Sequence, residues 1–417
     1  MTPSFSETTR VFARIGLLSF GGPAAQIALM HKELVDDRPW LTEDQFLSAL
    51  SFCMLLPGPE AMQLATYAGW RLHGTKGGLM AGALFVLPGA FVVLALSIIY
   101  ALLGDVPLVV ALFLGIKAAV VVIVIQALIK VSQRALKHPV SWAIAAASFV
   151  GIFFLALPYP LIVAAAAIVG VGFIPKASVH PAPISQPKSA HPLATIAIWG
   201  SLWAIPLLAL YLANAKLLTS IGLFFSKLAV VTFGGAYAVL AYMTQEVVVD
   251  KGWISTATMM DGLGLAETTP GPLILVTEFV GFQAAFAEGG LWLGIAGAAF
   301  ALWATFIPCF LWIFTAAPYL SQISSRPRLA AALSGITAAV VGVILNLSIW
   351  FALHVLFETA ELQHFGPLQI LVPDVATLNV HAAILACLAA LLMLRFKVGM
   401  GATLAVMAVS GLALSFF

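Results

Sequence analysis

Apolar segments of membrane-spanning length follow one another along nearly the whole chain, separated by short polar loops. A helix needs about 20 mostly apolar residues to cross the hydrocarbon core of a bilayer. Thirteen segments come close to this length or exceed it, and we expect them at 11–30, 46–72, 77–103, 107–130, 139–157, 159–174, 193–213, 217–243, 258–283, 290–317, 329–356, 379–394 and 398–417. The pattern predicts an all-α polytopic membrane protein.

The composition excludes other classes of protein. Of all residues 62% are apolar and 9% are charged, whereas soluble domains carry roughly 45–50% apolar and about 25% charged residues. A soluble enzyme and a disordered chain are therefore excluded. A net charge of +2 without a basic stripe gives no basis for nucleic-acid binding. Cys53, Cys309 and Cys387 lie in separate apolar runs and no histidine pair has ligand spacing, so we expect neither a metal nor a cofactor.

Two short motifs occur twice. Phe20-Gly21-Gly22 recurs as Phe233-Gly234-Gly235, and Pro57-Gly58-Pro59 recurs as Pro270-Gly271-Pro272, each at an offset of 213 residues. Glu33, Asp37 and Trp40, in the polar loop between the motifs, also meet identical residues at that offset, where apolar composition does not favour a chance match. The sequence therefore predicts an internal duplication.

The expected organisation follows from this duplication. The parts are a first repeat at 1–174, a polar proline-rich linker at 175–192, a connecting membrane helix at 193–216 and a second repeat at 217–417. Six segments and one connecting helix precede the second repeat, so parity inserts it upside down. The positive-inside rule supports this topology, since with a cytoplasmic N-terminus fourteen basic loop residues lie inside, and Lys32, Arg38 and Lys216 lie outside. The C-terminus is then outside.

The segments around the two motifs leave one topological alternative open. They can be full spans or re-entrant hairpins. The re-entrant arrangement keeps the inversion, but it moves the loop 31–45 inside and the loop 244–257 outside.

The motifs predict broken helices, which secondary transporters use to bind their substrates. Proline removes a backbone donor, and glycine permits positive φ angles. The half-helix that starts after each break presents free N–H groups, which favour an anion. The alternative is that these residues only permit close helix packing. The candidate substrate-binding residues are Gly21, Gly22, Pro23, Gln26, Pro57, Gly58, Pro59, Gly234, Gly235, Thr268, Thr269, Pro270, Gly271 and Pro272, with the hydroxyls of Ser19 and Thr232 as further donors.

Acidic residues next to the breaks are candidates for proton coupling. Glu60 follows the first PGP motif, and Glu267 precedes the second by three residues. Burial favours the protonated form of a carboxyl, so either residue can exchange a proton during transport. For Glu60 the alternative is an acidic residue that stabilises the first turn of a half-helix. We expect Asp261 and Glu278, which flank the second motif, near the membrane interface.

Basic residues inside the apolar segments are candidates for attracting an anion. Arg14 and Lys227 each lie six residues before an FGG motif, and Lys117 lies in the middle of a segment. The pattern indicates two related cations that face the pathway. Snorkelling to the interface is the alternative for Arg14 and Lys227, and a salt bridge to another helix is the alternative for Lys117.

The motifs resemble the chromate ion transporter family in its long, two-domain form. The resemblance rests on Phe20 to Met30, on Glu33 and Trp40, on Pro57-Gly58-Pro59-Glu60, on Leu87-Pro88-Gly89, on the second FGG motif and on Ala266 to Pro272. It implies proton-motive-force-driven efflux of chromate from the bacterial cytoplasm, antiparallel halves and a link to sulfate. One departure is Ala236, which stands after the second FGG motif where the first has Pro23.

We therefore expect a secondary active transporter, not an enzyme, in the bacterial cytoplasmic membrane. Its expected partners are chromate, sulfate as a second anion, protons and the lipid bilayer, without nucleic acid; assembly with further copies is open. The main rival is an importer of sulfate or another oxyanion. A second rival function is a passive anion channel. A membrane chromate reductase is disfavoured, because the chain has no dinucleotide fingerprint and no clustered cysteines. The sequence contains no P-loop pattern, so it gives no indication that ATP hydrolysis drives transport directly.

Overall fold

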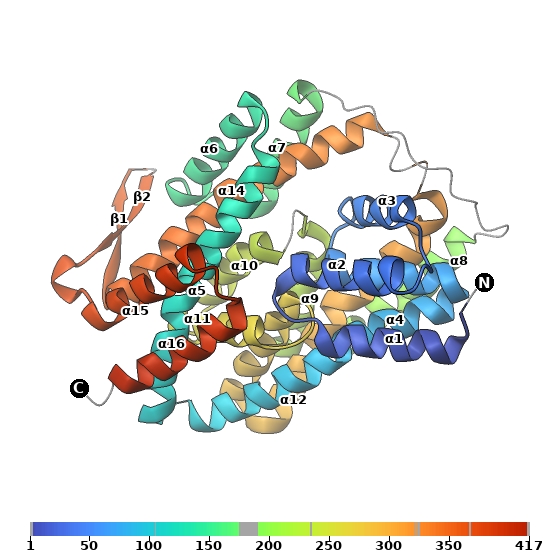
Figure 1. Ribbon diagram of the computed structural model, residues 1–417. Helices are drawn as coiled ribbons and strands as arrows, with labels where there is room; N and C mark the ends of the chain where they lie inside the picture. The colour runs from blue at the N-terminus through green and yellow to red at the C-terminus, as the bar shows by residue number, and fades with distance from the viewer. Residues whose placement is uncertain are drawn as a thin grey trace. The chain divides into compact units, whose positions relative to one another are not determined.

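Helices form almost all of the protein, as the computed structural model shows (Figure 1). The structure describes residues 3–104, 106–174, 191–233, 236–320, 322, 326–366 and 368–414. The chain forms two compact units, each of which is discontinuous in sequence.

Unit 1 comprises residues 1–101, 177–236 and 269–330. Its main elements are α1 (Phe5–Leu18), α2 (Gly22–His31), the π-helix η1 (Lys32–Asp36), α3 (Glu43–Cys53), α4 (Glu60–Leu103), α8 (Pro192–Leu212), α9 (Lys216–Val231), the 3₁₀-helices η3 (Leu273–Leu275) and η4 (Ala317–Tyr319), and α12 (Val276–Ala316).

Unit 2 comprises residues 102–176, 237–268 and 331–417. Its main elements are α5 (Pro107–Ala135), α6 (Pro139–Phe153), α7 (Tyr159–Phe173), α10 (Ala236–Thr244), the π-helix η2 (Gln245–Asp250), α11 (Thr256–Thr268), α14 (Pro327–Leu356), β1 (Ala360–Phe365), β2 (Leu368–Pro373), the 3₁₀-helix η5 (Val375–Thr377), α15 (Val380–Ala390), the π-helix η6 (Leu391–Arg395) and α16 (Met400–Leu414). Both units thus contain segments from both halves of the sequence.

The long helices α4 and α12 each reverse direction at a glycine. Gly74 in α4 has a φ of 62° and Gly290 in α12 has a φ of 74°, angles that L-residues rarely adopt. Gly69 and Gly77 touch each other across the first reversal, and Gly281 and Gly297 touch across the second. Each element is therefore a pair of antiparallel helices, and the reversals fall between the segments that we expected at 46–72 and 77–103 and at 258–283 and 290–317.

Two π-helices repeat the local structure of the loop that follows each FGG motif. η1 follows α2 and η2 follows α10, at nearly the sequence offset of the motifs. The backbone N–H of Trp40 donates to Leu34 O at 3.1 Å, and that of Trp253 donates to Val247 O at 2.8 Å. The same closing hydrogen bond thus occurs at equivalent positions of the two halves.

A small β-hairpin departs from the all-α prediction. β1 pairs with β2 in antiparallel register, with Ala360 opposite Pro373. The N–H of Gln369 donates to the carbonyl of Phe154, which docks the hairpin against the end of α6. From the sequence we expect only a loop at residues 357–378, since isolated two-stranded pairs are marginal and give a weak signal.

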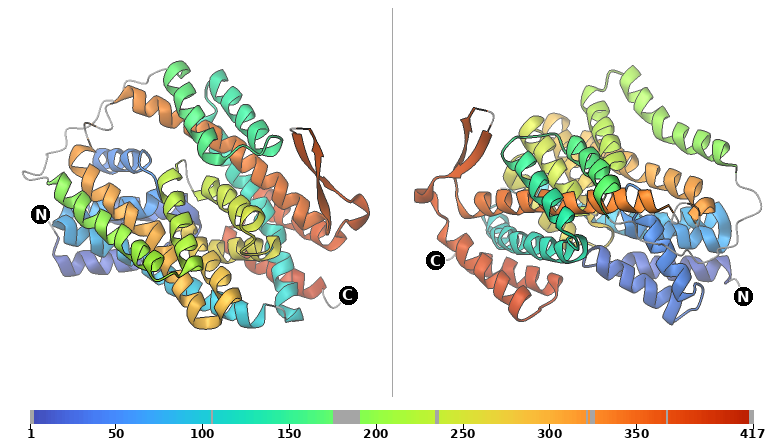
Figure 2. Two further views of the ribbon diagram at one scale, coloured as in Figure 1. Left: turned by 180° about the vertical axis from the view of Figure 1, so that it is seen from behind. Right: turned by 90° about the horizontal axis from the view of Figure 1, so that it is seen from above.

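Unit 2 is assembled by close helix contacts at glycines. α6 and α7 lie side by side along α14 (Figure 2), where β-carbons on Gly342 and Gly170 would overlap backbone carbonyls of the facing helices. α5 and α16 approach each other in the same way at Gly115 and Gly411. Small residues at helix interfaces are typical of membrane proteins, since they let backbones approach closely.

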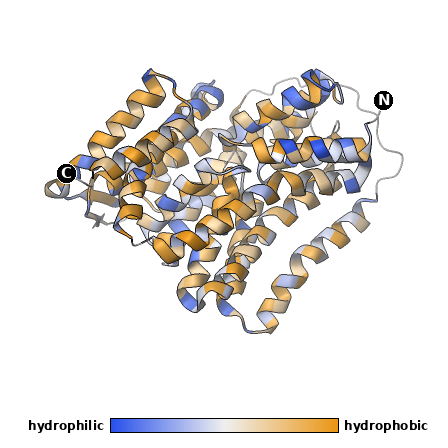
Figure 3. Cartoon of the chain, turned by 60° about the horizontal axis from the view of Figure 1, so that its bottom comes forward, coloured by the Kyte–Doolittle hydropathy of each residue, from blue (hydrophilic) through white to orange (hydrophobic). Residues whose placement is uncertain are grey.

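The outer faces of the helices are apolar. Most helices are hydrophobic along their length (Figure 3), and five of those described are long and apolar enough to span a membrane. On α8, Leu193 is 82% exposed and Leu212 is 69% exposed. Large exposed apolar residues in such number are stable in lipid and not in water, so this is a multi-pass membrane protein.

Replacing Gly115 by leucine tests the helix contact between α5 and α16. A β-carbon there would overlap the carbonyl oxygen of Met407, so we expect Gly115→Leu to lower the stability of the fold by about 1–3 kcal/mol. Gly172→Ala is the matched control, because its β-carbon meets no described atom within 4 Å. Thermal unfolding of the purified protein in detergent measures both, and equal midpoints for the two variants would contradict the prediction.

Candidate functional site

The FGG and PGP motifs of the first half interrupt helices where the sequence predicts breaks. α1 ends at Leu18 and α2 begins at Gly22, with Pro23 in its first turn. α3 ends at Cys53, and α4 begins at Glu60, directly after Pro59. Gly21 has a φ of 84° and Gly58 a φ of 119°, so both breaks need glycine.

The second half is interrupted at the matching places. α9 ends at Val231, α10 begins at Ala236, and α11 ends at Thr268, five residues before η3. Gly271 has a φ of 90°. Gly234 and Gly235, which the sequence analysis selected, lie outside the described residues.

Two reciprocal hydrogen bonds join the breaks of the two halves within unit 1. The N–H of Gly58 donates to Thr232 O at 2.9 Å, and the N–H of Gly271 donates to Ser19 O at 2.9 Å. Gly58 corresponds to Gly271 and Ser19 to Thr232 at the offset of 213 residues. The glycine of each PGP motif therefore bonds to the residue before the FGG motif of the other half, and we call this pair the crossed hydrogen bonds.

Gln26 strengthens one of the two junctions. Its Nε2 donates to Gly271 O at 2.6 Å and to Ser19 O at 3.3 Å. These carbonyls only accept, which fixes the orientation of the amide. The side chain is 1% exposed, and its Oε1 has no hydrogen-bond partner in the described part of the chain. Val239 stands at the equivalent position of the second half, so the two junctions differ.

Gln63 is a polar residue of the first PGP break that the sequence analysis missed. Its Nε2 donates to Pro57 O at 2.7 Å. The side chain is fully buried, and its Oε1 is without a hydrogen-bond partner among the described residues. The available signal was its position, one helical turn after Pro59 in the half-helix that starts there.

The hydroxyl groups near the breaks bond to their own helices. Ser19 Oγ donates to Ile15 O at 2.6 Å, and Thr268 Oγ1 donates to Leu265 O at 2.8 Å. Thr232 Oγ1 likewise donates to the carbonyl of Leu228. In this conformation these three hydroxyl hydrogens, like the N–H groups of Gly58 and Gly271, bond to protein carbonyls.

Arg14 lies in an ion cluster of unit 1 that the sequence analysis did not assemble. Its Nε lies 3.4 Å from Glu33 Oε1, and Arg38 Nη1 lies 2.5 Å from Glu33 Oε2. Glu33 is 2% exposed, whereas the Arg14 side chain is 58% exposed. A buried carboxylate on η1 thus holds both guanidinium groups. Lys227, the residue equivalent to Arg14, is exposed on α9.

Lys117 forms the salt bridge that was its alternative. Its Nζ lies 3.2 Å from Asp261 Oδ1, between α5 and α11 of unit 2. Asp261 and Glu278, which we expected near the membrane interface, are both buried, with exposed fractions of 4% and 2%. Helix neighbours that are remote in sequence bury both residues, and segment boundaries alone do not reveal them.

Glu60 and Glu267 have different surroundings. Glu60 is the first residue of α4 and is partly buried. Glu267 is 6% exposed near the end of α11, and its Oε1 accepts a hydrogen bond from Tyr237 at 2.8 Å. Tyr237 lies two residues after the second FGG motif, a position that the sequence analysis did not weigh.

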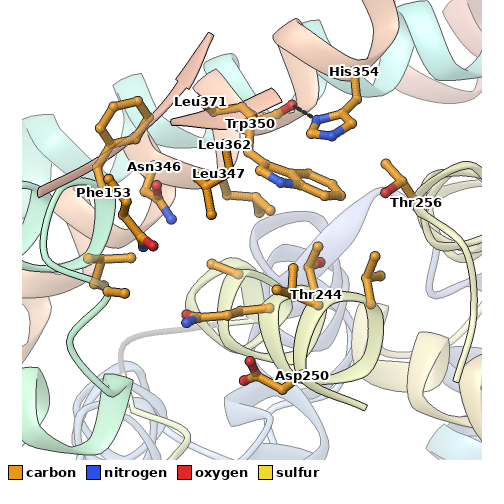
Figure 4. A pocket seen from close by; sticks show the side chains of 17 residues that line it. Phe153, Thr244, Asp250, Thr256, Asn346, Leu347, Trp350, His354, Leu362 and Leu371 are labelled. Carbon is orange, nitrogen blue, oxygen red and sulfur yellow. Dashed lines mark hydrogen bonds between the residues drawn. The ribbon is translucent and has the colours of Figure 1, made fainter. Parts of the chain in front are cut away.

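Unit 2 contains a cavity of about 370 Å³ whose lining includes none of the predicted site residues. Its walls come from the end of α6, from η2, from the second half of α14 and from the β-hairpin (Figure 4). α6 contributes Phe153 and η2 contributes Asp250 to the lining. α14 contributes Trp350, and the hairpin contributes Leu371. η2 therefore lies at the same end of unit 2 as the end of α6 and the hairpin.

Comparisons with known proteins give the family. The model of a family described as "Chromate transporter" matches residues 6–171 and again residues 219–414. A probable chromate transport protein of Synechococcus elongatus is 32% identical over 346 residues, which cover 82% of this chain and 83% of that protein. The chromate transport proteins of Pseudomonas aeruginosa and Cupriavidus metallidurans are 32% and 30% identical, over 82% of this chain and 79% and 81% of their own lengths. No solved structure matches the chain.

Alanine at the PGP glycines tests the geometry of the breaks. A β-carbon on Gly58 would lie 2.8 Å from Gln63 Nε2, and one on Gly271 would lie 2.9 Å from Leu275 Cδ1. We expect Gly58→Ala and Gly271→Ala each to cost about 1–3 kcal/mol more than Gly252→Ala. Gly252 also has a positive φ but open space around it, so its variant isolates the backbone strain. Chemical unfolding in detergent compares the three, and equal losses would disprove steric crowding at the breaks.

The pH dependence of hydrogen exchange tests the role of His31 in the polar loop of unit 1. The Nε2 of His31 lies 2.6 Å from Glu43 Oε2 and its Nδ1 lies 3.3 Å from Asp36 Oδ2. The hydrogen bond with Glu43 raises the pKa of His31 above its usual 6.5. Protonated His31 therefore stabilises the folded loop fully at a pH below the usual pKa of 6.5. This stabilisation is lost as the pH rises through the raised pKa of the folded protein. We expect hydrogen-exchange protection of residues 31–45 to fall over that range and to be flat in His31→Gln; flat protection in the parent protein would contradict this.

Proposed function

Because the chain belongs to the chromate transporter family, we propose that it is a secondary active transporter that exports chromate across the bacterial cytoplasmic membrane. The proton motive force drives export, which confers resistance to chromate. The observation that carries the proposal is the pair of crossed hydrogen bonds, because it brings the two predicted anion-binding breaks together in one unit.

The anion binds at the PGP breaks, between residues 57–59 and 270–272. There chromate replaces the carbonyls of Thr232 and Ser19 as acceptor for the N–H groups of Gly58 and Gly271. The first turn of α4 adds N–H groups that have no partner within the helix, and its dipole favours a negative charge. A tetrahedral oxyanion carries acceptors on all sides, so one ion can accept from both halves.

Alternating access uses the reciprocity of the crossed hydrogen bonds. The two bonds are equivalent by motif, so opening one while the other stays closed gives two anion-free states of opposite access, and both bonds are open in the anion-bound state between them. In the conformation described here both bonds are formed. The additional bonds of Gln26 hold the Gly271 junction more firmly than the Gly58 junction, so the two states differ in energy.

The halves are inverted, and the segments between the motifs are re-entrant. The cavity of unit 2 supports re-entrance, because Asp250 of η2, Phe153 of α6 and Leu371 of the hairpin line it together. The parity of the expected segments puts the loops after α6 and α14 outside. The loop 244–257 then also lies outside, as the re-entrant alternative requires, and the offset of 213 residues puts the loop 31–45 inside.

The orientation is N-terminus inside and C-terminus outside, as the distribution of basic loop residues supports. On this orientation, the Arg14–Glu33–Arg38 cluster belongs to the cytoplasmic end of the pathway.

Glu267 is the proton-coupling residue that the surroundings favour over Glu60. It is buried in α11, three residues before the second PGP motif. A carboxylate near an anion repels it, and a protonated carboxyl does not. Proton uptake and anion binding are therefore linked. Glu60, at the first residue of α4, stabilises the helix N-terminus.

Uptake of labelled chromate into everted membrane vesicles tests this function. We expect accumulation that requires an imposed pH gradient, stops with a protonophore and drops at least about tenfold in Gly271→Ala, because strain there disrupts an anion contact worth more than 1.4 kcal/mol. Gly252→Ala serves as the control with near-parental uptake. Excess sulfate grades the selectivity. Uptake found only in right-side-out vesicles would contradict export and indicate an importer.

A further inference from the structure

Tyr237 and Glu267 form a hydrogen-bonded pair between the start of α10 and the end of α11. The Tyr237 hydroxyl donates to Glu267 Oε1 at 2.8 Å. Tyr237 is the second residue of α10 and Glu267 the last but one of α11. α10 begins after the FGG break of the second half, and α11 ends before the PGP break. The hydrogen bond between Tyr237 and Glu267 therefore joins the two helix ends that border these breaks.

The other oxygen of Glu267 is buried and has no hydrogen-bond partner among the residues that the structure describes. An ionised carboxylate oxygen in that place lacks the donors that a buried charge requires. A protonated oxygen is different, because it carries an O–H group of its own. Since Tyr237 already donates to Oε1, the acidic hydrogen belongs on Oε2.

The charged groups around the pair leave Glu267 without an ion partner in the described structure. α5 contributes Lys117, Lys130 and Arg134. Lys117 is neutralised by Asp261, and Lys130 acts on Glu267 only through its longer-range charge. α16, which also packs against α11, has no titratable residue. The one hydrogen-bonding group that the described structure offers the Glu267 carboxyl is thus the Tyr237 hydroxyl.

We propose that Oε2 of Glu267 is the atom that binds the coupling proton, and that Tyr237 is the positioning residue that directs the proton to it. The inference rests on the proposed function and extends it to a residue and an atom. Tyr237 donates to Oε1 in both protonation states, so the carboxyl cannot turn and the proton exchanges on one side only. Losing this donor destabilises the ionised form, because a hydrogen bond to a carboxylate is stronger than one to a neutral carboxyl.

Chromate transport in liposomes containing the purified full chain, measured over a series of pH values, tests the pair. We expect Glu267→Gln to abolish the pH dependence. In Tyr237→Phe the pH dependence remains, but its midpoint moves to higher pH by about one unit, the size expected for one charge-assisted hydrogen bond. Tyr242→Phe is the matched control, because Tyr242 on the same helix donates to Glu246 at 2.7 Å. Its pH profile should equal that of the parent protein.

Infrared difference spectra between low and high pH give a second measurement that needs no transport. We expect one C=O band of a protonated carboxyl in the parent spectrum to be missing from the Glu267→Gln spectrum, and the same band to be shifted in Tyr237→Phe. An unshifted midpoint and an unshifted band in Tyr237→Phe would overturn the role of Tyr237. Carboxyl bands in Glu267→Gln that are identical to those of the parent, or a pH dependence that persists there, would overturn the role of Glu267 while chromate export stands. Absent chromate transport by the parent protein would instead overturn the proposed function, and the infrared bands would then decide the proton site alone.

Discussion

A broken helix inside a membrane must find hydrogen-bond partners within the protein, because lipid offers none. The two PGP motifs solve this problem reciprocally, since the freed amide of each glycine bonds to a carbonyl that the FGG break of the other half has freed. Each of the four interruptions would leave backbone groups without hydrogen-bond partners if it occurred alone. Together they supply these partners to one another in pairs. The position of the breaks, the mixing of both halves in unit 1 and the proposed anion site all depend on these two bonds.

The sequence predicted those parts of the fold that local chemistry determines. Glycines with positive φ next to prolines without an N–H interrupt the helices at residues 20–23, 57–59 and 270–272, whereas the single prolines Pro88, Pro206 and Pro308 lie inside helices. The apolar segments likewise predicted a helical membrane protein. The weak pattern at residues 360–373 did not predict the β-hairpin, which depends on docking against Phe154, far away in the sequence.

Partners that are remote in sequence were harder to predict. For Lys117 the sequence left two roles open, a cation that faces the pathway and a partner in a salt bridge. Only the packing of α5 on α11 identifies Asp261 as its partner. For the same reason the sequence did not reveal that Asp261 and Glu278 are buried. Tyr237 and Gln63 were missed because neither residue type is rare in a membrane helix, and only their contacts with Glu267 and Pro57 distinguish them.

The interleaving of the two halves also bears on how such a protein can arise. A chain with the first half alone would bury the Gly58 amide without the Thr232 carbonyl, and the Ser19 carbonyl without the Gly271 amide. On the inverted arrangement proposed above, two separate copies could supply these missing groups to each other if they assembled with opposite orientations. Joining them in one chain fixes the stoichiometry at one to one. It also frees each copy to diverge, as Gln26 and Val239 have done at equivalent positions.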